Sequence, residues 1–343
     1  MKSGGLAAVL REPKGPPGVV VERLPPVAPG QGEVKVSVRA AALNHLDLWV
    51  ASGAQRVPPP RVLAADCSGV VVESLSPAVA PGMEVVLYPV VSCWECEACR
   101  RGEQIRCPEF GILGEHVDGC ACTEIVVPAQ MIYPKPAHLD FAAAAAFPLT
   151  YLTAWRLLST LAGVRPLDRV LVVGVGGGLG AAALLLARHL GARVAATSRR
   201  AEVRQRALAL GAEAAFDSAA FAEAAKRWSS GGVDLVIDHV GPATLDESLR
   251  SLRRGGKLAI PGSTSGIKAE VNLPRLFWNQ AQILGSSMGN AGEFQDMLEA
   301  VASGLQPQVD SVFPLDQVRR AMERLQAGEQ TGKVVLTMPE GGR

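Results

Sequence analysis

From Arg169 onward, short runs of apolar residues alternate with stretches of helical periodicity, and this alternation limits the fold more than any other feature. The apolar runs are "RVLVVG", "ARVAATS", "AEAAFD", "VDLVIDHVG" and "GKLAIPG", and residues 179–190 and 201–210 are the clearest helical stretches between them. Strands that are apolar on both faces are typical of a parallel sheet covered by helices. Repeated strand–helix units therefore predict a doubly wound α/β domain, with "AQILGSSM" as its edge strand.

Residues 1–145 have a different pattern, in which short alternating runs are separated by proline and glycine. In "EVKVSVRAA", Val34, Val36 and Val38 alternate with other residues, as in a half-buried strand. "RVLAADCSGVVVES", "MEVVLYP" and "TEIVVP" are further strand candidates, so this part is expected to be an all-β domain.

The chain has 343 residues, which is more than one ordinary hydrophobic core holds. Near the C-terminus, "PLDQVRRAMERLQAG" is expected to be helical and "GKVVLTM" to be a strand that rejoins the N-terminal domain. The expected division is a β domain made of residues 1–145 and 289–343, and a doubly wound domain made of residues 146–288.

A glycine-rich loop follows the first strand of the doubly wound part, in "VVGVGGGLGAAALLLARHLGARV". A strict G-x-G-x-x-G does not fit, because Leu179 stands where the third glycine would fall. Gly174, Gly177 and Gly180 fit a G-x-x-G-x-x-G variant instead. Glycines at these positions let a pyrophosphate approach the backbone at the N-terminus of a helix. The loop predicts a dinucleotide site; the alternative is a turn that packs helix on strand without a ligand.

The end of the second strand indicates which dinucleotide binds. NAD sites place Asp or Glu there for the ribose hydroxyls, whereas this chain has "TSRRAE", with Ser198, Arg199 and Arg200. A hydroxyl and two guanidinium groups suit the 2′-phosphate of NADP(H). NADP(H) is therefore preferred over NAD(H), the alternative being a solvated helix start with surface arginines.

Four of the seven cysteines, Cys93, Cys96, Cys99 and Cys107, follow the spacing C-x2-C-x2-C-x7-C. Four thiolates can enclose one Zn²⁺ tetrahedrally, and a closed all-cysteine set is the structural type of zinc site. A catalytic zinc ion needs an open position, which four protein thiolates do not leave. The lobe at residues 92–108 therefore predicts one structural Zn²⁺; disulfides and metal-free thiols are the alternatives.

Composition argues against several classes of partner. The formal net charge is +1, so nothing indicates a nucleic acid or an anionic membrane. No apolar run reaches the ~18 residues of a membrane-spanning helix. The start, "MKSGGLAAVLREP", lacks the pattern of a secretory signal, so a cytoplasmic location with reduced cysteines is expected.

The β domain with its cysteine lobe, the dinucleotide fold and the final "TGKVVLTM" together resemble the medium-chain dehydrogenase/reductase superfamily. "PLTYLTAW", "VIDHVG" and "GGKLAIPG" are similar to segments of that family too, and the resemblance covers essentially the whole chain. It implies a GroES-like β-barrel catalytic domain, a Rossmann domain inserted before its last segment, and an active site in the cleft between them. It also implies a homodimer joined near "QILGSSM", or a homotetramer of such dimers.

The chain departs from the zinc alcohol dehydrogenases of this family at their catalytic centre. Their zinc ligands, typically Cys, His and Cys, match Asn44, Ala65 and Leu149 here, which cannot ligate zinc usefully. The hydroxyl and imidazole of their proton relay match Leu46 and Trp49. "NHLDLW" instead resembles the Asn-x-x-Asp of the zinc-free quinone oxidoreductase branch.

The catalytic candidates are Asn44 as a hydrogen-bond donor, Asp47 as its orienter or a cleft-shaping residue, and Tyr151 as a donor to a developing oxyanion. The alternative for Asn44 and Asp47 is that they cap the helix that starts there. The residues expected at the cofactor are His45, Thr153, Gly174, Gly177, Gly178, Leu179, Gly180, Ser198, Arg199, Arg200, Val240, Gly241, Gly262, Ser263 and Lys333.

Without a Lewis acid, alcohol oxidation loses stabilisation of the alkoxide, whereas hydride transfer to a conjugated acceptor needs less assistance. The predicted function is therefore NADPH-dependent reduction of a quinone or an α,β-unsaturated carbonyl compound. One alternative is a zinc-type alcohol dehydrogenase with atypical ligands, such as Cys67 with His45, Asp47 or Asp66. Another is a non-catalytic NADPH-binding protein.

Overall fold

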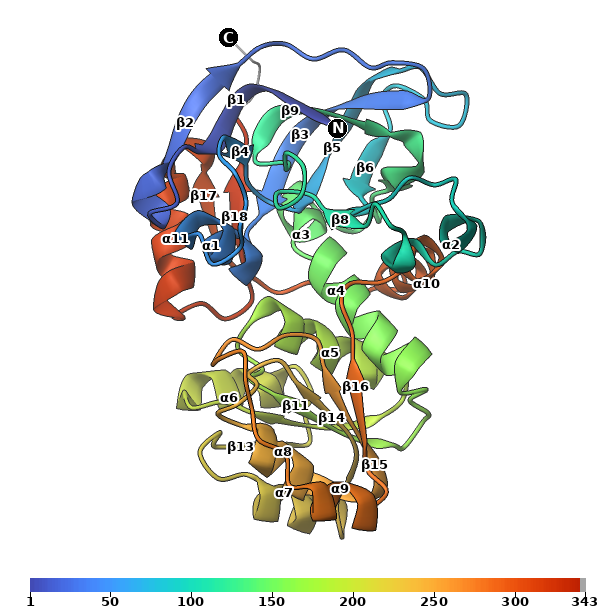
Figure 1. Cartoon of the computed structure of the whole chain (residues 1–343), viewed down its shortest axis with the longest axis vertical. Helices are drawn as coiled ribbons and strands as arrows, with labels where there is room; N and C mark the ends of the chain where they lie inside the picture. Colours follow the sequence, from blue (N-terminus) through green and yellow to red (C-terminus); the bar gives the residue numbers. More distant parts are fainter. Residues whose placement is uncertain (340–343) are drawn as a thin grey trace. The chain divides into compact units, whose positions relative to one another are not determined.

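The computed structural model of this chain describes residues 1–339, which form two compact units (Figure 1). The first unit contains Met1–Leu149 and the chain from Asn290 onward, and the second unit is Thr150–Gly289. The sequence-based boundaries lie after residues 145 and 288. No helix among the described residues has the length and apolarity that crossing a bilayer requires.

The first unit is built mainly from strands. They are β1 (Lys2–Leu10), β2 (Val19–Leu24), β3 (Glu33–Ala42), β4 (Arg61–Val62), β5 (Asp66–Ser74), β6 (Glu84–Leu87), β7 (Val90–Val91), β8 (Gly111–Ile112), β9 (Cys122–Pro128), β10 (Ile132–Pro134), β17 (Val309–Pro314) and β18 (Lys333–Thr337). Over residues 1–339, ten of them form one sheet in which β10, β6, β5, β3, β9, β1 and β2 are successive neighbours. β18 joins beside β3 and pairs with β17, β4 pairs with β1, and β7 and β8 form a separate pair.

β3 lies between β5 and β9 in this sheet, and its sequence explains its place. Val34, Val36 and Val38 are at most 2% exposed, while the residues between them are half-buried, which is the alternation that the sequence predicts. The returning strand β18 pairs antiparallel with the last residues of β3, where Val335 lies opposite Ala42. The C-terminal strand thus belongs to the sheet of the first unit.

The helices of the first unit are short, apart from two that the C-terminal segment supplies. They are α1 (His45–Ser52), α2 (Glu97–Arg100), α3 (Phe141–Ala145), α10 (Ala291–Ala302) and α11 (Val318–Ala327), with 3₁₀ turns at Pro16–Gly18, Gln104–Arg106, Ala129–Met131 and Leu315–Gln317. α3 packs on the sheet through small side chains, with Ala145 in one buried cluster with Ala40 and Val335. Alanines on both surfaces let helix and strands approach closely.

The second unit contains six strands in the described chain, all parallel, in the order β13, β12, β11, β14, β15, β16. Their bounds are β11 (Arg169–Val173), β12 (Arg193–Thr197), β13 (Ala214–Phe216), β14 (Val233–Asp238), β15 (Leu252–Ile260) and β16 (Gln282–Gly285). The helices are α4 (Pro148–Trp155), which enters from the first unit and continues as a π-helical stretch (Arg156–Leu161), α5 (Gly178–His189), α6 (Ala201–Ala209), α7 (Ala222–Ser229), α8 (Leu245–Ser251) and α9 (Leu273–Trp278). The predicted doubly wound sheet is confirmed, with β16 at its edge.

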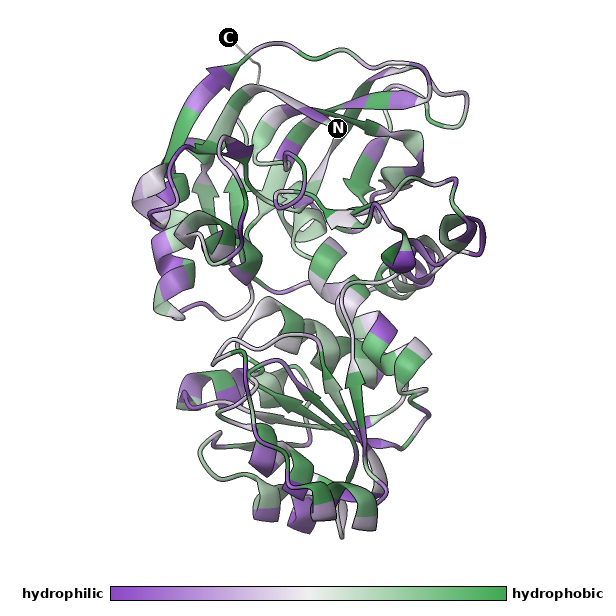
Figure 2. Cartoon of the chain, in the orientation of Figure 1, coloured by the Kyte–Doolittle hydropathy of each residue, from purple (hydrophilic) through white to green (hydrophobic). Residues whose placement is uncertain are grey.

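Helices cover both faces of this sheet: Figure 1 shows α5 on one side and α7 and α8 on the other. Leu171 and Val173 of β11 belong to the core that includes Phe221 and Leu249 beneath α7 and α8. Val170 and Val172 are also fully buried and, by the period of a strand, point to the opposite face. Burial on both faces explains why the strands are apolar throughout, as their green colour in Figure 2 shows.

Candidate functional site

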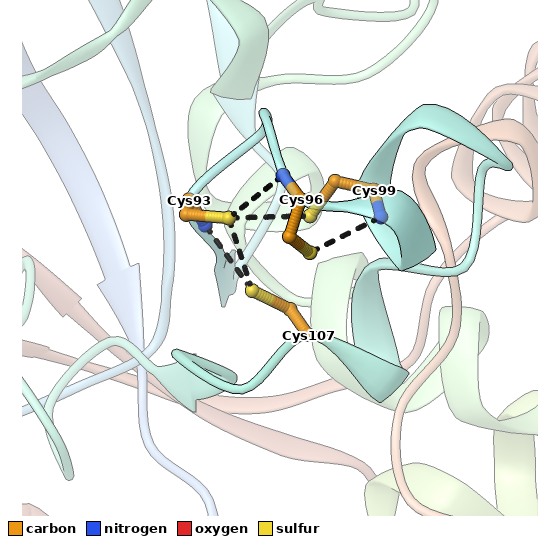
Figure 3. A group of neighbouring side chains, drawn as sticks. All are labelled: Cys93, Cys96, Cys99 and Cys107. Atoms are coloured by element: carbon orange, nitrogen blue, oxygen red, sulfur yellow. Dashed lines mark hydrogen bonds between the residues drawn. The ribbon is translucent and has the colours of Figure 1, made fainter.

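The cysteine lobe lies in the first unit between β7 and β8, and its four cysteine side chains converge (Figure 3). The sulfur atoms of Cys93, Cys96, Cys99 and Cys107 all lie within 4.8 Å of one another. Cys93 Sγ is 3.4 Å from Cys107 Sγ and 3.9 Å from Cys99 Sγ. A tetrahedral Zn²⁺ with ~2.3 Å bonds to sulfur needs sulfur atoms about 3.8 Å apart, so this set fits the ion.

Backbone N–H groups also face these sulfur atoms. The amide of Cys96 lies 3.3 Å from Cys93 Sγ, and the amide of Cys99 lies 3.5 Å from Cys96 Sγ. Hydrogen bonds from the amides of Glu95 and Cys96 lower the pKa of the Cys93 thiol to about 7. Burial acts in the other direction and raises the pKa of Cys99 to about 12. A Zn²⁺ ion would hold these residues as thiolates and cross-link the lobe.

The lobe is attached to the point where the chain returns to the first unit. Gln104 is 5% exposed; its Oε1 accepts from Ala291 N at 3.2 Å, and its Nε2 donates to Cys99 O at 3.4 Å. The amide of Ile105 donates to Asn290 Oδ1 at 3.2 Å. Asn290 is the N-cap of α10 and Ala291 is its first residue, so an ordered lobe fixes the start of this helix.

A second polar cluster in the first unit joins residues that are distant in sequence. Asn44 Nδ2 donates to Asp66 Oδ2 at 2.9 Å, and Lys333 Nζ donates to Asp66 Oδ2 at 2.8 Å and to Asn44 Oδ1 at 2.5 Å. The amide of Leu149 donates to the other oxygen of Asp66 at 2.8 Å. Asn44, Asp66 and Lys333 are at most 7% exposed. Removing one partner of a buried ion pair lowers the stability of the fold by about 3–5 kcal/mol. Asp66 and Lys333 therefore hold each other in place, and both hold the Asn44 amide.

Asp47 lies in the first turn of α1 and is 3% exposed. Its Oδ2 accepts from Asn44 N at 2.7 Å, and its Oδ1 accepts from Ala64 N at 2.8 Å. Burial raises the pKa of Asp47 to about 6, against the opposing effect of these hydrogen bonds and of Lys333. Asp47 thus caps the start of α1, which is the alternative that the sequence left open, and also connects this helix to residue 64.

His45 is the first residue of α1 and is half-buried. Burial lowers its pKa, and the positive charge of Lys333 adds to this effect. The centroid of its ring lies 6.5 Å from that of Trp49. A neutral imidazole offers one donor and one acceptor, which suits the predicted contact with a ribose or phosphate group.

In the second unit, the glycine loop leads from β11 into α5, whose N-cap and first three residues are Gly177, Gly178, Leu179 and Gly180. Gly174 has a φ of 79°, and a Cβ there would lie 2.8 Å from the ring of His239. A Cβ on Gly180 would lie 2.6 Å from the carbonyl oxygen of Gly174. Only glycine fits at both positions, and the resulting turn leads directly into a helix N-terminus that can meet a pyrophosphate.

The carboxyl ends of β14 and β15 carry the next group of predicted cofactor residues. The carboxylate of Asp238, at the end of β14, accepts from the amides of Val240 and Gly241 at 2.9 and 3.1 Å. Two hydroxyl groups, from α8 and its N-cap, also donate to it. A Cβ on Gly241 would lie 2.9 Å from Ser263 Cβ, and Gly262 precedes this serine. These residues therefore adjoin at the edge where doubly wound sheets bind ligands.

Ser198, Arg199 and Arg200 follow β12, as predicted for a phosphate site. Ser198 Oγ accepts from the amide of Arg200 at 3.2 Å, and the Arg199 side chain is exposed. The guanidinium group of Arg200 lies beside the glycine loop, because a Cβ on Gly176 would be 3.5 Å from its Nη2. Its Nε is 3.6 Å from the carboxylate of Glu202.

Arg204 orders this segment from the next turn of α6. Its Nη1 donates to the carbonyl oxygens of Ser198 and Arg199 at 2.8 and 3.0 Å, and to Asp217 at 3.1 Å. Asp217 balances the charge of Arg204, and Glu202 lies beside Arg200, so the exposed Arg199 is the cation of residues 198–200 that most directly suits an added phosphate.

Tyr151 and Thr153 lie on α4 at the start of the second unit and are both buried. Burial raises the pKa of Tyr151, so its hydroxyl keeps its proton and is a hydrogen-bond donor. Thr153 Oγ1 lies 3.9 Å from Met288 Sδ.

Three residues that shape these clusters are missing from the sequence-based predictions of the site: Asp66 as the centre of the Asn44 cluster, Arg204 and Asp238. Asp66 interrupts the apolar run "RVLAADCSGVVV" and Asp238 ends the apolar strand "VDLVID". A lone carboxylate in an apolar strand is rarely buried without partners, and this signal identifies both. Arg204 stands among other arginines, and its sequence carries no such signal.

In the part of the chain that the structure describes, side-chain atoms that could ligate a metal ion converge at one place. Among residues 1–339, the four cysteines are the one set of three or more His, Cys, Asp or Glu side chains whose ligand atoms meet. The alternative set, Cys67 with His45, Asp47 or Asp66, is therefore not formed.

Known proteins match both units. The family models for the alcohol dehydrogenase GroES-like domain and the zinc-binding dehydrogenase match residues 30–137 and 178–303. The spectinabilin polyketide synthase system protein NorB of Streptomyces orinoci is 33% identical over 93% of this chain, which spans 14% of NorB. The acryloyl-coenzyme A reductase of Metallosphaera sedula is 28% identical over 93% of this chain and 96% of its own length. A crystal structure of an NAD-dependent alcohol dehydrogenase is 39% identical, with 97% of this chain and 100% of that chain covered and a TM-score of 0.94.

The contacts of the lobe lead to a prediction about its zinc ligands. We expect Cys99→Ser to lower the zinc content below one atom per chain and to lower the melting temperature by at least about 5 °C. Because Gln104 and Ile105 connect the lobe to α10, amide hydrogen exchange should rise in Ala291–Ala302 as well as in the lobe. Elemental analysis and exchange mass spectrometry measure both effects. Cys67→Ser, at a buried cysteine outside the lobe, is the matched control; full zinc content and unchanged exchange in Cys99→Ser would contradict the prediction.

Proposed function

Because the chain belongs to the medium-chain dehydrogenase/reductase superfamily of NAD(P)-dependent oxidoreductases, we propose that it transfers a hydride from NADPH to a quinone or an α,β-unsaturated carbonyl compound. The proposal includes one structural Zn²⁺ in the cysteine lobe and no catalytic zinc. Bound NADPH would supply the hydride, and the residues of the chain bind the two reactants, orient them and donate hydrogen bonds.

One observation carries the proposal: the positions that the family resemblance matches to the zinc ligands of the alcohol dehydrogenases lie around a carboxylate and not around a metal-binding set. Asn44 and Leu149 both donate hydrogen bonds to Asp66, which follows Ala65 directly. An amide, a methyl group and an isobutyl group do not replace the thiolate and imidazole donors that Zn²⁺ prefers. The positive charge beside Asp66 comes from Lys333.

A conjugated acceptor suits such a site. Reduction of a quinone or an enone spreads the developing negative charge over several atoms, so it needs less electrophilic assistance than the oxidation of an alcohol. Fixed hydrogen-bond donors supply orientation and charge stabilisation. The amide of Asn44 has two N–H groups and uses one on Asp66, which leaves the other for an acceptor oxygen. The protonated hydroxyl of Tyr151 is the second proposed donor.

For the cofactor we propose NADP(H) in preference to NAD(H). The hydroxyl of Ser198 and the guanidinium groups of Arg199 and Arg200 suit the additional phosphate, and Arg204 holds the backbone between them. One similar structure is named an NAD-dependent alcohol dehydrogenase, so the proposed preference rests on these side chains and not on the fold. His45, Thr153 and the glycine loop are the remaining proposed contacts. Lys333 already uses its ammonium group on Asp66 and Asn44, so we assign it to that network.

The acceptor and the cellular setting follow from the same features. The similar acryloyl-coenzyme A reductase is named for an activated alkene, which supports α,β-unsaturated thioesters within the proposed substrate class. All seven cysteines are free thiols in the described chain, and four of them form the proposed zinc site. We therefore propose a reducing, cytoplasmic setting.

We also propose that the chain forms a homodimer through the edge of the second unit's sheet. β16 is an edge strand, and Ile283 on it is 38% exposed. The neighbouring helix in sequence, α9, has no buried residue, and Leu273, Phe277 and Trp278 are 60–69% exposed. An open strand edge and exposed aromatic residues are both typical of interfaces, and two such edges can pair around a two-fold axis.

The proposed reaction predicts both the metal content and the acceptors. We expect one zinc atom per chain by elemental analysis, and oxidation of NADPH with quinones, enones or enoyl thioesters in an absorbance assay. Two zinc atoms per chain together with alcohol oxidation would favour the zinc-type alcohol dehydrogenase with atypical ligands. Tight NADPH binding without turnover of any acceptor in the panel would favour the non-catalytic alternative.

The proposed phosphate site predicts a change in cofactor preference. We expect Ser198→Ala with Arg199→Asp to weaken NADPH binding about 100-fold, because charge-assisted hydrogen bonds to the phosphate are lost. NADH, which lacks that phosphate, should change less than about threefold. Titration calorimetry with both cofactors measures the difference, and Arg227→Asp on the exposed side of α7 is the charge-matched control. Equal losses for the two cofactors would refute the phosphate assignment.

The proposed interface predicts the mass in solution. We expect light scattering to give twice, or for a tetramer four times, the chain mass of 35.9 kDa. Ile283→Arg should shift the mass toward that of the monomer, because a buried charge at the strand edge opposes pairing. Leu208→Arg on α6, where the leucine is 39% exposed, is the matched control. A wild-type protein that is monomeric at micromolar concentration would exclude the interface.

A further inference from the structure

Ala64 has a backbone conformation that alanine rarely adopts. Its φ is 69°, in the left-handed region, which costs about 1–2 kcal/mol for a residue with a Cβ. It lies two residues before Asp66, the carboxylate that accepts from Asn44 and Lys333. Strain of this kind persists only where the surroundings impose it, and it concentrates at functional sites.

Contacts on both sides of Ala64 impose this conformation. Its amide donates to Asp47 Oδ1 at 2.8 Å, and its carbonyl oxygen accepts from the amide of Cys120 at 2.9 Å. Gly114 and Gly119 pack so closely that a Cβ on them would lie 3.0 Å from Ala64 N and 2.2 Å from Ala64 O. Neighbouring backbone thus encloses Ala64 on both its amide and its carbonyl side, and the side chain of Asp47 supplies the hydrogen-bond acceptor for its amide.

We propose that Asp47 is a positioning residue, which holds Ala64 in the left-handed conformation so that Asp66 meets Asn44 and Lys333. Both of its oxygens accept from backbone amides, one at Asn44 and one at Ala64, so it connects the start of α1 to the strained residue. The effect on catalysis rests on the proposed function, since it acts through the Asn44 donor. The control of residue 64 by Asp47 stands independently of that function.

The rival role for Asp47 is that of a proton donor to the substrate. Its surroundings contain the charged or titratable groups Lys333, Asp66 and His45. With a pKa near 6, a proton donor would act only while it is protonated, so the rate would fall as the pH rises through that range. A positioning residue acts through geometry, so a change in the backbone of residue 64 should compensate for its loss.

The test combines Asp47→Asn with Ala64→Gly, and uses Ala65→Gly as the matched control. Glycine adopts a positive φ without steric cost, so Ala64→Gly removes the need for Asp47 at this position. Ala65 is also buried and loses the same methyl group, but its φ is not positive. We expect Asp47→Asn to lower kcat at least about tenfold and to change the KM for NADPH less than about threefold. In that background, Ala64→Gly should restore kcat at least about threefold, whereas Ala65→Gly should not.

A second readout does not depend on turnover. We expect amide exchange in residues 61–67 to rise about tenfold in Asp47→Asn, and the urea concentration at the midpoint of unfolding to fall. Adding Ala64→Gly should recover part of that fall. If the wild type reduces no acceptor, the proposed function fails and this readout still decides the inference. If Asp47→Asn does not fold, we expect the double variant with Ala64→Gly to fold. The double variant with Ala65→Gly should remain unfolded. If the rate of the wild type falls as the pH rises through about 6, and Asp47→Asn abolishes this fall without rescue by Ala64→Gly, the proposal is overturned. Unchanged exchange in Asp47→Asn would also overturn it.

Discussion

The buried ion pair between Asp66 and Lys333 is the interaction on which the first unit depends. The two residues are 267 positions apart, yet Asp66 opens β5 and Lys333 opens β18 on the two sides of β3. Ala42 of β3 lies opposite both Asp66 and Val335, and Lys333 is two residues from Val335, so the pair spans three strands near the end of β3. A buried pair offsets its desolvation only when its remaining oxygens are satisfied, and the amides of Asn44 and Leu149 meet that need.

The C-terminal segment is therefore fixed at both ends by polar contacts with the N-terminal part of the chain. Its first residues, Asn290 and Ala291, are bonded to Ile105 and Gln104 of the cysteine lobe, and its last strand is held through Lys333. This gives the two clusters separate tasks. The lobe stabilises the start of α10, while the Asp66 cluster orders the Asn44 amide that we propose as a donor. In the proposed function, a metal in the lobe would contribute to the fold, and the residues around Asp66 would serve the chemistry.

The sequence predicts the features that local pattern controls. The alternation of Val34, Val36 and Val38, the apolar strands of the doubly wound sheet and the cysteine spacing all depend on neighbours within a few residues. The Asp66 cluster depends on a lysine near the other end of the chain, and no periodicity indicates which buried carboxylate meets which cation. The conformation of residue 64 is hidden for another reason: an alanine gives no signal of a positive φ, whereas a glycine there would.

Asp47 shows that this geometry is maintained at the expense of stability. Burial raises its pKa from 3.8 to about 6, so between these values the unfolded chain loses a proton that the folded chain keeps. Stability therefore falls as the pH rises through this window, and the loss remains at neutral pH, where the buried carboxylate is ionised. The strain at Ala64 acts in the same direction. The buried carboxylate of Asp47 and the strained backbone of Ala64 are both unfavourable, and one hydrogen bond joins them. Because Ala64 lies two residues before Asp66, a requirement of the site explains both features better than a requirement of the core.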